Sequence, residues 1–113
     1  MKMTDYTFHC PFLSQIVYLT RERIEHIRGG HPEFNAMEEP TMIETIRITI
    51  KEPSIIVPSR KDPDGLVFAK WQPHIYGGKY VVVTVITSLE RNWIITAFIS
   101  RYKPKGIVLW MQD

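Results

Sequence analysis

The sequence predicts an α+β domain in which two N-terminal helices pack on a four-stranded, or slightly larger, antiparallel sheet. Three observations support this: one amphipathic segment before a Gly-Gly pair, a second between two prolines, and strand-like segments with short turns over the remainder. Helices followed by consecutive hairpin-linked strands are typical of this class. With 113 residues, we expect a single domain over residues 1–113.

The first third of the chain predicts a strand, a helix and a stiff corner. The segment FLSQIVYLT is expected to be extended and to end near Thr20, whose hydroxyl is a suitable N-cap for a helix. In RERIEHIR, Ile24 and Ile27 lie on one side of that helix. We expect the glycine pair at 29–30 to end it in a left-handed C-cap, and the proline after His31 to keep His31 out of helix.

The segment EEPTMIETIRITIKEP predicts the second helix. Pro40 stands near its start, where a missing amide costs nothing, and Pro53 ends it. Ile43, Ile46 and Ile50 follow at helical spacing. The β-branched residues of IRITI leave a strand as the alternative, although the spacing favours a helix.

The remainder reads as strands joined by turns. The predicted strands are SIIVPS, LVFAKWQ, KYVVVTVITS and WIITAFISRY, with turns at RKDPDGL and PHIYGGK. GIVLWMQ is expected to be an edge strand or a tail packed on the sheet.

Alternation predicts which side chains share a face of the two longest strands. In WIITAFISRY, the set expected to face a ligand is Ile94, Thr96, Phe98, Ser100 and Tyr102. The set expected to face the helices is Trp93, Ile95, Ala97, Ile99 and Arg101. In KYVVVTVITS, Tyr80, Val82 and Thr84 share one face.

Composition restricts the classes of protein to consider. The formal charge of +2, from 14 basic and 12 acidic residues, does not by itself indicate a nucleic-acid-binding protein. The single cysteine excludes an intramolecular disulfide and a cysteine-rich metal cage. The sequence lacks a signal-peptide pattern and an apolar run of transmembrane length, so we expect a cytoplasmic protein without membrane contact.

The histidines of RIEHIRGGHPEF do not predict a metal site. His26 and His31 are five positions apart, whereas helical zinc ligands are typically four apart. We therefore expect no metal and no cofactor. On residue types alone, His26 fits a solvent-facing helix residue and His31 a turn-fixing one, so this corner does not establish catalysis.

Four segments in order carry a resemblance to a known family. They are LTRERIEHIRGGHPEF, IRITIKEPSII, KYVVVTVI and WIITAFIS, spanning about residues 16–106. Together they resemble the phage-type nucleases of the barnase/EndoU/colicin/RelE-like superfamily, and the most specific part is the helix with HI followed by HPE. The resemblance implies a small toxin-like or phage-associated endoribonuclease that cleaves RNA without metal, using the 2′-hydroxyl as nucleophile.

The resemblance also implies roles for particular residues. His26 corresponds to a general acid or base, while His31 and Glu33 shape the corner. The catalytic candidates are His26, His31, Lys79, Thr96 and Ser100. The RNA-binding candidates are Arg28, Tyr80, Phe98, Arg101 and Tyr102. By alternation, Ser100 and Arg101 are not expected to face one cleft.

One departure and two alternatives accompany this reading. Relatives usually carry a basic residue immediately before HPE, where this chain has Gly30, so activity requires a substitute such as Arg28.

The alternatives are a non-catalytic RNA-binding module and a protein-interaction domain that dimerises through the edge near GIVLWMQ. Toxins of this kind are commonly neutralised by an antitoxin or immunity protein, which would be a further partner.

Overall fold

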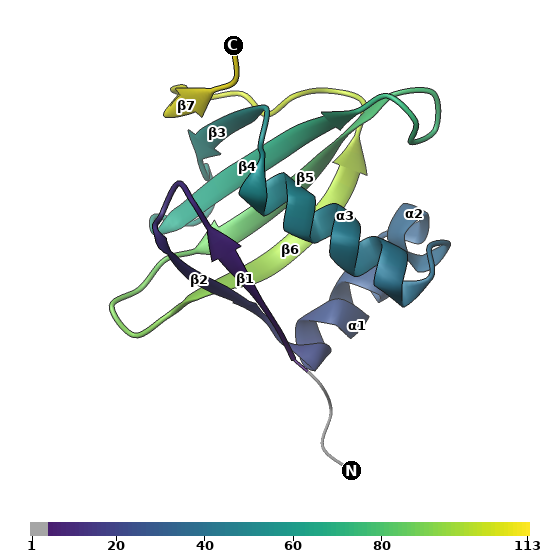
Figure 1. The fold of residues 1–113 in the computed structure, drawn as a ribbon, viewed down its shortest axis with the longest axis horizontal. Helices are drawn as coiled ribbons and strands as arrows, with labels where there is room; N and C mark the ends of the chain where they lie inside the picture. The colour runs from purple at the N-terminus through teal and green to yellow at the C-terminus, as the bar shows by residue number, and fades with distance from the viewer. Residues whose placement is uncertain (1–4) are drawn as a thin grey trace.

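A computed structural model describes residues 5–113, which form a curled seven-stranded sheet and three helices (Figure 1). The elements are β1 (Tyr6–Cys10), β2 (Gln15–Leu19), α1 (Arg21–Gly30), α2 (Pro32–Asn35), α3 (Glu39–Lys51), β3 (Ile55–Pro58), β4 (Gly65–Gln72), β5 (Lys79–Ile86), β6 (Asn92–Ser100) and β7 (Trp110–Met111). The strand order is β1-β2-β6-β5-β4-β3-β7, and β2 and β6 are parallel whereas all other neighbours are antiparallel.

The predicted arrangement of two helices on a four-stranded antiparallel sheet is wrong. In residues 5–113 the sheet is larger and mixed, a hairpin of β1 and β2 precedes the helices, and α2 is an additional short helix. The hairpin adds two strands, because Phe8 and Cys10 of β1 alternate into the core beside Val17 and Leu19 of β2. The C-terminal tail adds β7, so the alternative of an edge strand in GIVLWMQ is confirmed.

The start of α1 is as predicted, whereas its end is not. Thr20 Oγ1 accepts a hydrogen bond from the Arg23 amide at 3.3 Å, which is the expected N-cap. The helix continues through Gly29 and Gly30, and neither glycine has a positive φ. Helix α1 ends at His31, with φ −134°, because Pro32 disfavours a helical conformation in the residue before it.

The helices cover one face of the sheet and form the main core with it. Helix α3 lies across β4, β5 and β1, while α1 and α2 lie against β6 (Figure 1). The predicted stripe of Ile43, Ile46 and Ile50 is buried there, as are Ile24 and Ile27 of α1. The sheet contributes Phe68, Val81, Val83, Val85, Ile94 and Ala97.

The opposite face of the sheet, here called the open face, carries a smaller apolar cluster. Its members include Ile55, Val57, Val67, Ala69, Tyr80, Val82 and Phe98. A β-bulge separates Thr84, opposite Thr96, from Val85, opposite Ile94. Ile94 therefore packs in the helix-side core, contrary to the predicted alternation, whereas Thr96, Phe98 and Ser100 remain on the open face.

The chain after β6, residues 101–109, forms a strap that returns over the open face to β3. A Cβ on Gly106, which has φ +146°, would lie 3.5 Å from Cβ of Val57. The Leu109 amide then donates to the Ile56 carbonyl at 2.9 Å, and β7 pairs with β3. The strap thereby encloses one side of the open face.

Within residues 5–113, no helix has the length and apolar character needed to cross a membrane.

A partly buried ion pair joins the start of α1 to the start of α3. Arg21 donates to both carboxylate oxygens of Glu39, at 2.5 and 2.7 Å, and the Tyr6 hydroxyl donates to Oε2 at 2.9 Å. These hydrogen bonds, first of all that from Arg21, hold the pKa of the Glu39 carboxyl at about 2. The same pair raises the pKa of Arg21, and the bond to Glu39 raises that of Tyr6.

We expect Glu39→Gln to lower the free energy of unfolding at pH 7, because it removes the charge that pairs with Arg21. The expected loss is only about 1–2 kcal/mol, because 27% of Glu39 and 21% of Arg21 remain exposed and water screens the pair. A carboxyl whose pKa is lower in the folded state stabilises the fold above its unfolded pKa, near 4.5, and loses this contribution as the pH falls towards 2. Urea unfolding of both proteins between pH 7 and pH 2 measures the difference. A difference that stays constant over that range contradicts the assignment, and Glu44→Gln, at an exposed pair with Arg47, is the control with a smaller expected loss.

Candidate nucleic-acid interface

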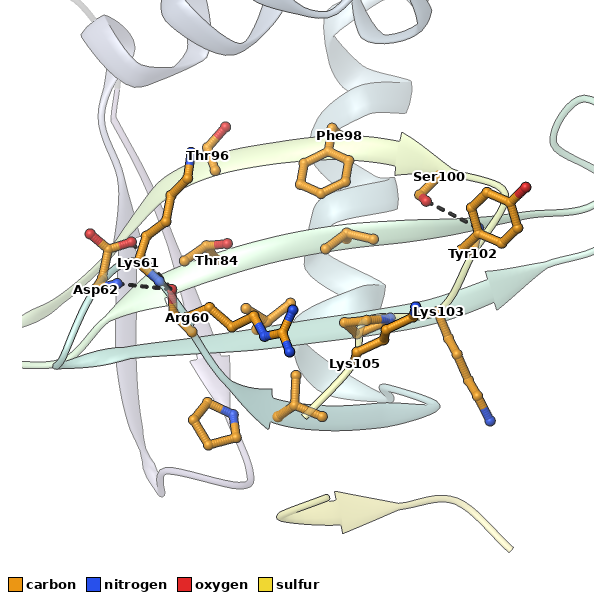
Figure 2. Close-up of a pocket in the computed structure, with 16 residues that line it drawn as sticks. Arg60, Lys61, Asp62, Thr84, Thr96, Phe98, Ser100, Tyr102, Lys103 and Lys105 are labelled. Atoms are coloured by element: carbon orange, nitrogen blue, oxygen red, sulfur yellow. Dashed lines mark hydrogen bonds between the residues drawn. The ribbon is translucent and has the colours of Figure 1, made fainter. Parts of the chain in front are cut away.

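The open face contains a groove of about 390 Å³ (Figure 2). Side chains of β3, β4, β5 and β6 form its floor, namely Val57, Val67, Val82, Thr84, Thr96, Phe98 and Ser100. The loop of residues 59–62 forms one wall, and residues 102–105 of the strap form the other. The floor is thus largely apolar, with hydroxyl groups at defined places.

Strand register sets the positions of those hydroxyl groups. Thr84 lies opposite Thr96, Val82 opposite Phe98, and Tyr80 opposite Ser100. Residues 96 and 100 are four apart along β6, which corresponds to about 13 Å at roughly 3.3 Å per residue. The Phe98 ring therefore lies between a pair of threonine hydroxyls and a single serine hydroxyl.

The walls of the groove concentrate positive charge. Arg60 and Lys61 come from the loop, and Lys103 and Lys105 from the strap, against the single carboxylate of Asp62 (Figure 2). Within residues 5–113, none of these four cationic side chains forms an ion pair or a side-chain hydrogen bond. Four cations and one anion give +3 at the groove, compared with +2 for the whole chain, so the groove is a focus of positive potential.

The loop that carries Arg60 and Lys61 is held tightly. Ser59 Oγ accepts from the amides of Lys61 and Asp62, at 3.3 and 3.1 Å. The Ser59 amide donates to the Gly65 carbonyl at 2.9 Å, and a Cβ on Gly65 would lie 2.8 Å from Cβ of Ser59. The two cations are therefore presented by a fixed turn, which reduces the entropy cost of binding an anion.

Of the ten residues predicted from the sequence, four line the groove. These are Thr96, Phe98, Ser100 and Tyr102. Tyr80 lies beside them on the open face, where its ring meets Trp71 edge to face at 5.0 Å. The structure thus brings together five of the predicted residues, all from β5, β6 and the start of the strap.

Of the two predicted histidines, His31 contacts a residue of the groove. The His31 ring packs against Phe98, with 5.8 Å between ring centroids and an angle of 31°. His26 is exposed on α1, three positions after Arg23, so both lie on one flank of the helix. Arg23 donates to the Ile95 carbonyl at 3.4 Å, so this flank borders the edge of β6.

Lys79 and Arg101 lie in a separate depression of about 310 Å³ with Glu33, Tyr76 and Ile99. Lys79 Nζ donates to the Tyr76 carbonyl at 2.7 Å. Ser100 lines the groove and Arg101 lines the depression. This confirms the prediction from strand alternation that the two side chains do not face one cleft.

Arg28 lies outside both hollows. Its guanidinium donates to the carbonyls of Met37, at 2.8 Å, and Asn35, at 3.4 Å, and lies 4.0 Å from Glu39. It connects α1 to the loop before α3, so it does not replace a basic side chain at position 30. A Cβ on Gly30 would meet no heavy atom within 4 Å, so a larger residue fits there.

Sequence reasoning missed the four cations of the groove walls. Each pair stands in a loop directly after a strand of the open face, in PSRKD after β3 and in YKPKG after β6. The signal in the sequence is a pair of basic residues after each of two strands that share a face. Only the sheet order shows that the two loops carrying these pairs face each other.

No group of three or more histidine, cysteine, aspartate or glutamate side chains in residues 5–113 is placed to hold a metal ion. No family model, curated protein or solved structure matches the chain.

Proposed function

We propose that the protein is a metal-independent endoribonuclease that binds single-stranded RNA in the groove of the open face. The observation that carries the proposal is a set of four cations, without side-chain partners among residues 5–113, around a floor of aromatic, apolar and hydroxyl groups. Each of these groups matches one part of a nucleotide: phosphate, base or ribose.

The binding chemistry follows from those groups. Arg60, Lys61, Lys103 and Lys105 neutralise phosphates and release counterions. The Phe98 ring offers a stacking surface for an unpaired base. The hydroxyls of Thr84, Thr96 and Ser100 are donors and acceptors suited to ribose and phosphate oxygens.

Cleavage by the 2′-hydroxyl requires one group to remove its proton and another to protonate the departing 5′-oxygen. The new bond joins O2′ to phosphorus, the P–O5′ bond breaks, and the products are a 2′,3′-cyclic phosphate and a 5′-hydroxyl end. His31, beside Phe98, and His26, on the adjacent helix flank, are the groups for these two transfers. The wall cations stabilise the additional negative charge on the phosphorane.

Non-catalytic RNA binding is the second candidate. Its support is that, in the part of the chain that the structure describes, the groove lining contains binding groups but no histidine. Incubating RNA with the protein separates the two candidates, because only an endoribonuclease cuts the RNA that it binds.

The test is incubation of a mixed-sequence RNA with the protein in excess EDTA. We expect wild type to give fragments ending in cyclic phosphate, and His26→Ala or His31→Ala to reduce the rate at least about 100-fold with unchanged circular dichroism. His9→Ala, at an exposed histidine of β1, is the matched control and should retain the wild-type rate.

RNA that is bound but not cut by wild type would establish the second candidate. RNA that is neither bound nor cut by the folded protein would reject both.

A further inference from the structure

We infer that the bound RNA continues from the groove over the end of β6 into the depression of Glu33, Tyr76, Lys79 and Arg101, which forms a second nucleotide subsite. This inference rests on the proposed binding of RNA in the groove, and it extends the substrate to a strand that occupies both hollows.

The two hollows are lined by consecutive residues at the end of β6. Ser100 lines the groove and Arg101 lines the depression, and consecutive Cα atoms are about 3.8 Å apart. A second link lies in the corner after α1, where the His31 ring packs on Phe98 of the groove and Glu33 lines the depression. The corner and the strand end, here called the ridge, therefore each touch both hollows.

The depression has groups suited to one nucleotide. Within residues 5–113, Arg101 has no ion-pair or side-chain hydrogen-bond partner, and Lys79 Nζ has one bond and two further donors for a phosphate. The Glu33 carboxylate is an acceptor for the amino group of a base.

Tyr76 supplies an aromatic surface at the mouth of the depression. Its side chain is 55% exposed, and its backbone is left-handed with φ 45°, which costs a non-glycine residue roughly 1 kcal/mol. The bond from Lys79 to the Tyr76 carbonyl and that from the Gly78 amide to the Ile75 carbonyl, at 2.7 and 2.8 Å, hold this turn. The strained turn thus directs an exposed ring beside two cations.

A strand that crosses the ridge must bend between the two subsites. The phosphate at the bend would lie next to His31 and Ser100, the groups on the groove side of the ridge. Bending separates the bases on its two sides, so a base in the groove can stack on Phe98 and a base beyond the bend, farther along the strand than a 4-mer that fills the groove, can stack on Tyr76. The ridge is therefore the place at which we expect the bond to be cut.

The test measures affinity against length with fluorescent 2′-O-methyl RNA of 4 and 12 nucleotides, which lacks the nucleophile and stays intact. We expect Lys79→Ala/Arg101→Ala to bind the 4-mer as wild type does and the 12-mer about tenfold more weakly. Arg60→Ala/Lys61→Ala should weaken binding of both lengths. Arg47→Ala/Lys51→Ala removes two charges from α3 and should change neither affinity by more than about twofold.

Equal 12-mer affinity of Lys79→Ala/Arg101→Ala and wild type would overturn the second subsite and leave the groove intact as a proposal. Unchanged binding of both lengths by Arg60→Ala/Lys61→Ala would reject the groove, and with it the subsite. If loss of the Lys79 bond to Tyr76 unfolds the double variant, Arg101→Ala alone, at an exposed residue, should show the same dependence on length, and its absence would overturn the subsite.

Discussion

Replacing Arg60, Lys61, Lys103 and Lys105 with glutamine is expected to weaken RNA binding at least about 100-fold at 0.1 M salt. These side chains supply the positive charge of the groove, and each phosphate contact on a single strand contributes about 0.7 to the slope of log K against log salt. Loss of four contacts should therefore reduce that slope by roughly 2.8. Fluorescence anisotropy with 2′-O-methyl RNA over a salt series measures both quantities.

The thermal stability of this quadruple variant should remain close to that of wild type, because the four side chains form no hydrogen bonds or ion pairs within residues 5–113. Arg47→Gln/Lys51→Gln, on α3, is the charge control for variants that carry only two of the four groove substitutions. A quadruple variant with wild-type affinity and slope would show that RNA, if bound, lies elsewhere on the molecule.

Phe34→Ala is expected to lower the free energy of unfolding by about 3–5 kcal/mol, which is a large part of the stability of a domain of this size. The Phe34 side chain is fully buried in the main core, and α2 is only four residues long, so burial of this ring is what anchors the corner after α1. Truncation leaves a cavity and removes the contacts of the ring with its neighbours.

Urea unfolding followed by circular dichroism measures this loss, and Phe12→Ala is the matched control. Phe12 is exposed in the turn between β1 and β2, so its truncation should cost about 1 kcal/mol or less. A loss below about 1 kcal/mol for Phe34→Ala would contradict the anchoring role. Since His31 lies three residues before Phe34, we also expect the variant to lose the contact of His31 with Phe98.

Local features of the fold could be predicted from the sequence because neighbouring residues determine them. Thr20 caps α1, the isoleucine stripe of α3 faces the sheet, and Tyr80, Val82 and Thr84 of β5 share one face as expected. The alternation in β6 holds from Thr96 onwards and fails at Ile94, because a bulge inserts one residue and leaves no mark in the pattern of side chains.

Features that depend on distant pairing could not be predicted in the same way. The parallel contact of β2 with β6 pairs residues 17–18 with 92–93, and no periodicity within either segment indicates its partner. For the same reason, the loop of residues 59–62 and the strap read as ordinary turns, whereas the sheet order makes them opposite walls of a groove. The sequence predicts Thr96, Phe98, Ser100 and Tyr102 of the groove, but neither Thr84 nor the four wall cations.

The parallel pairing of β2 with β6 also has a kinetic consequence. Val17 and Asn92 are 75 positions apart, whereas Ile86 and Trp93 of the β5–β6 hairpin are seven apart. Loop-closure entropy grows as (3/2)RT ln n, so the distant pair costs about 2 kcal/mol more to close. We therefore expect the meander of β4, β5 and β6 to form early in folding and the N-terminal hairpin to dock late. The floor of the groove would then be assembled before the far edge of the sheet is complete.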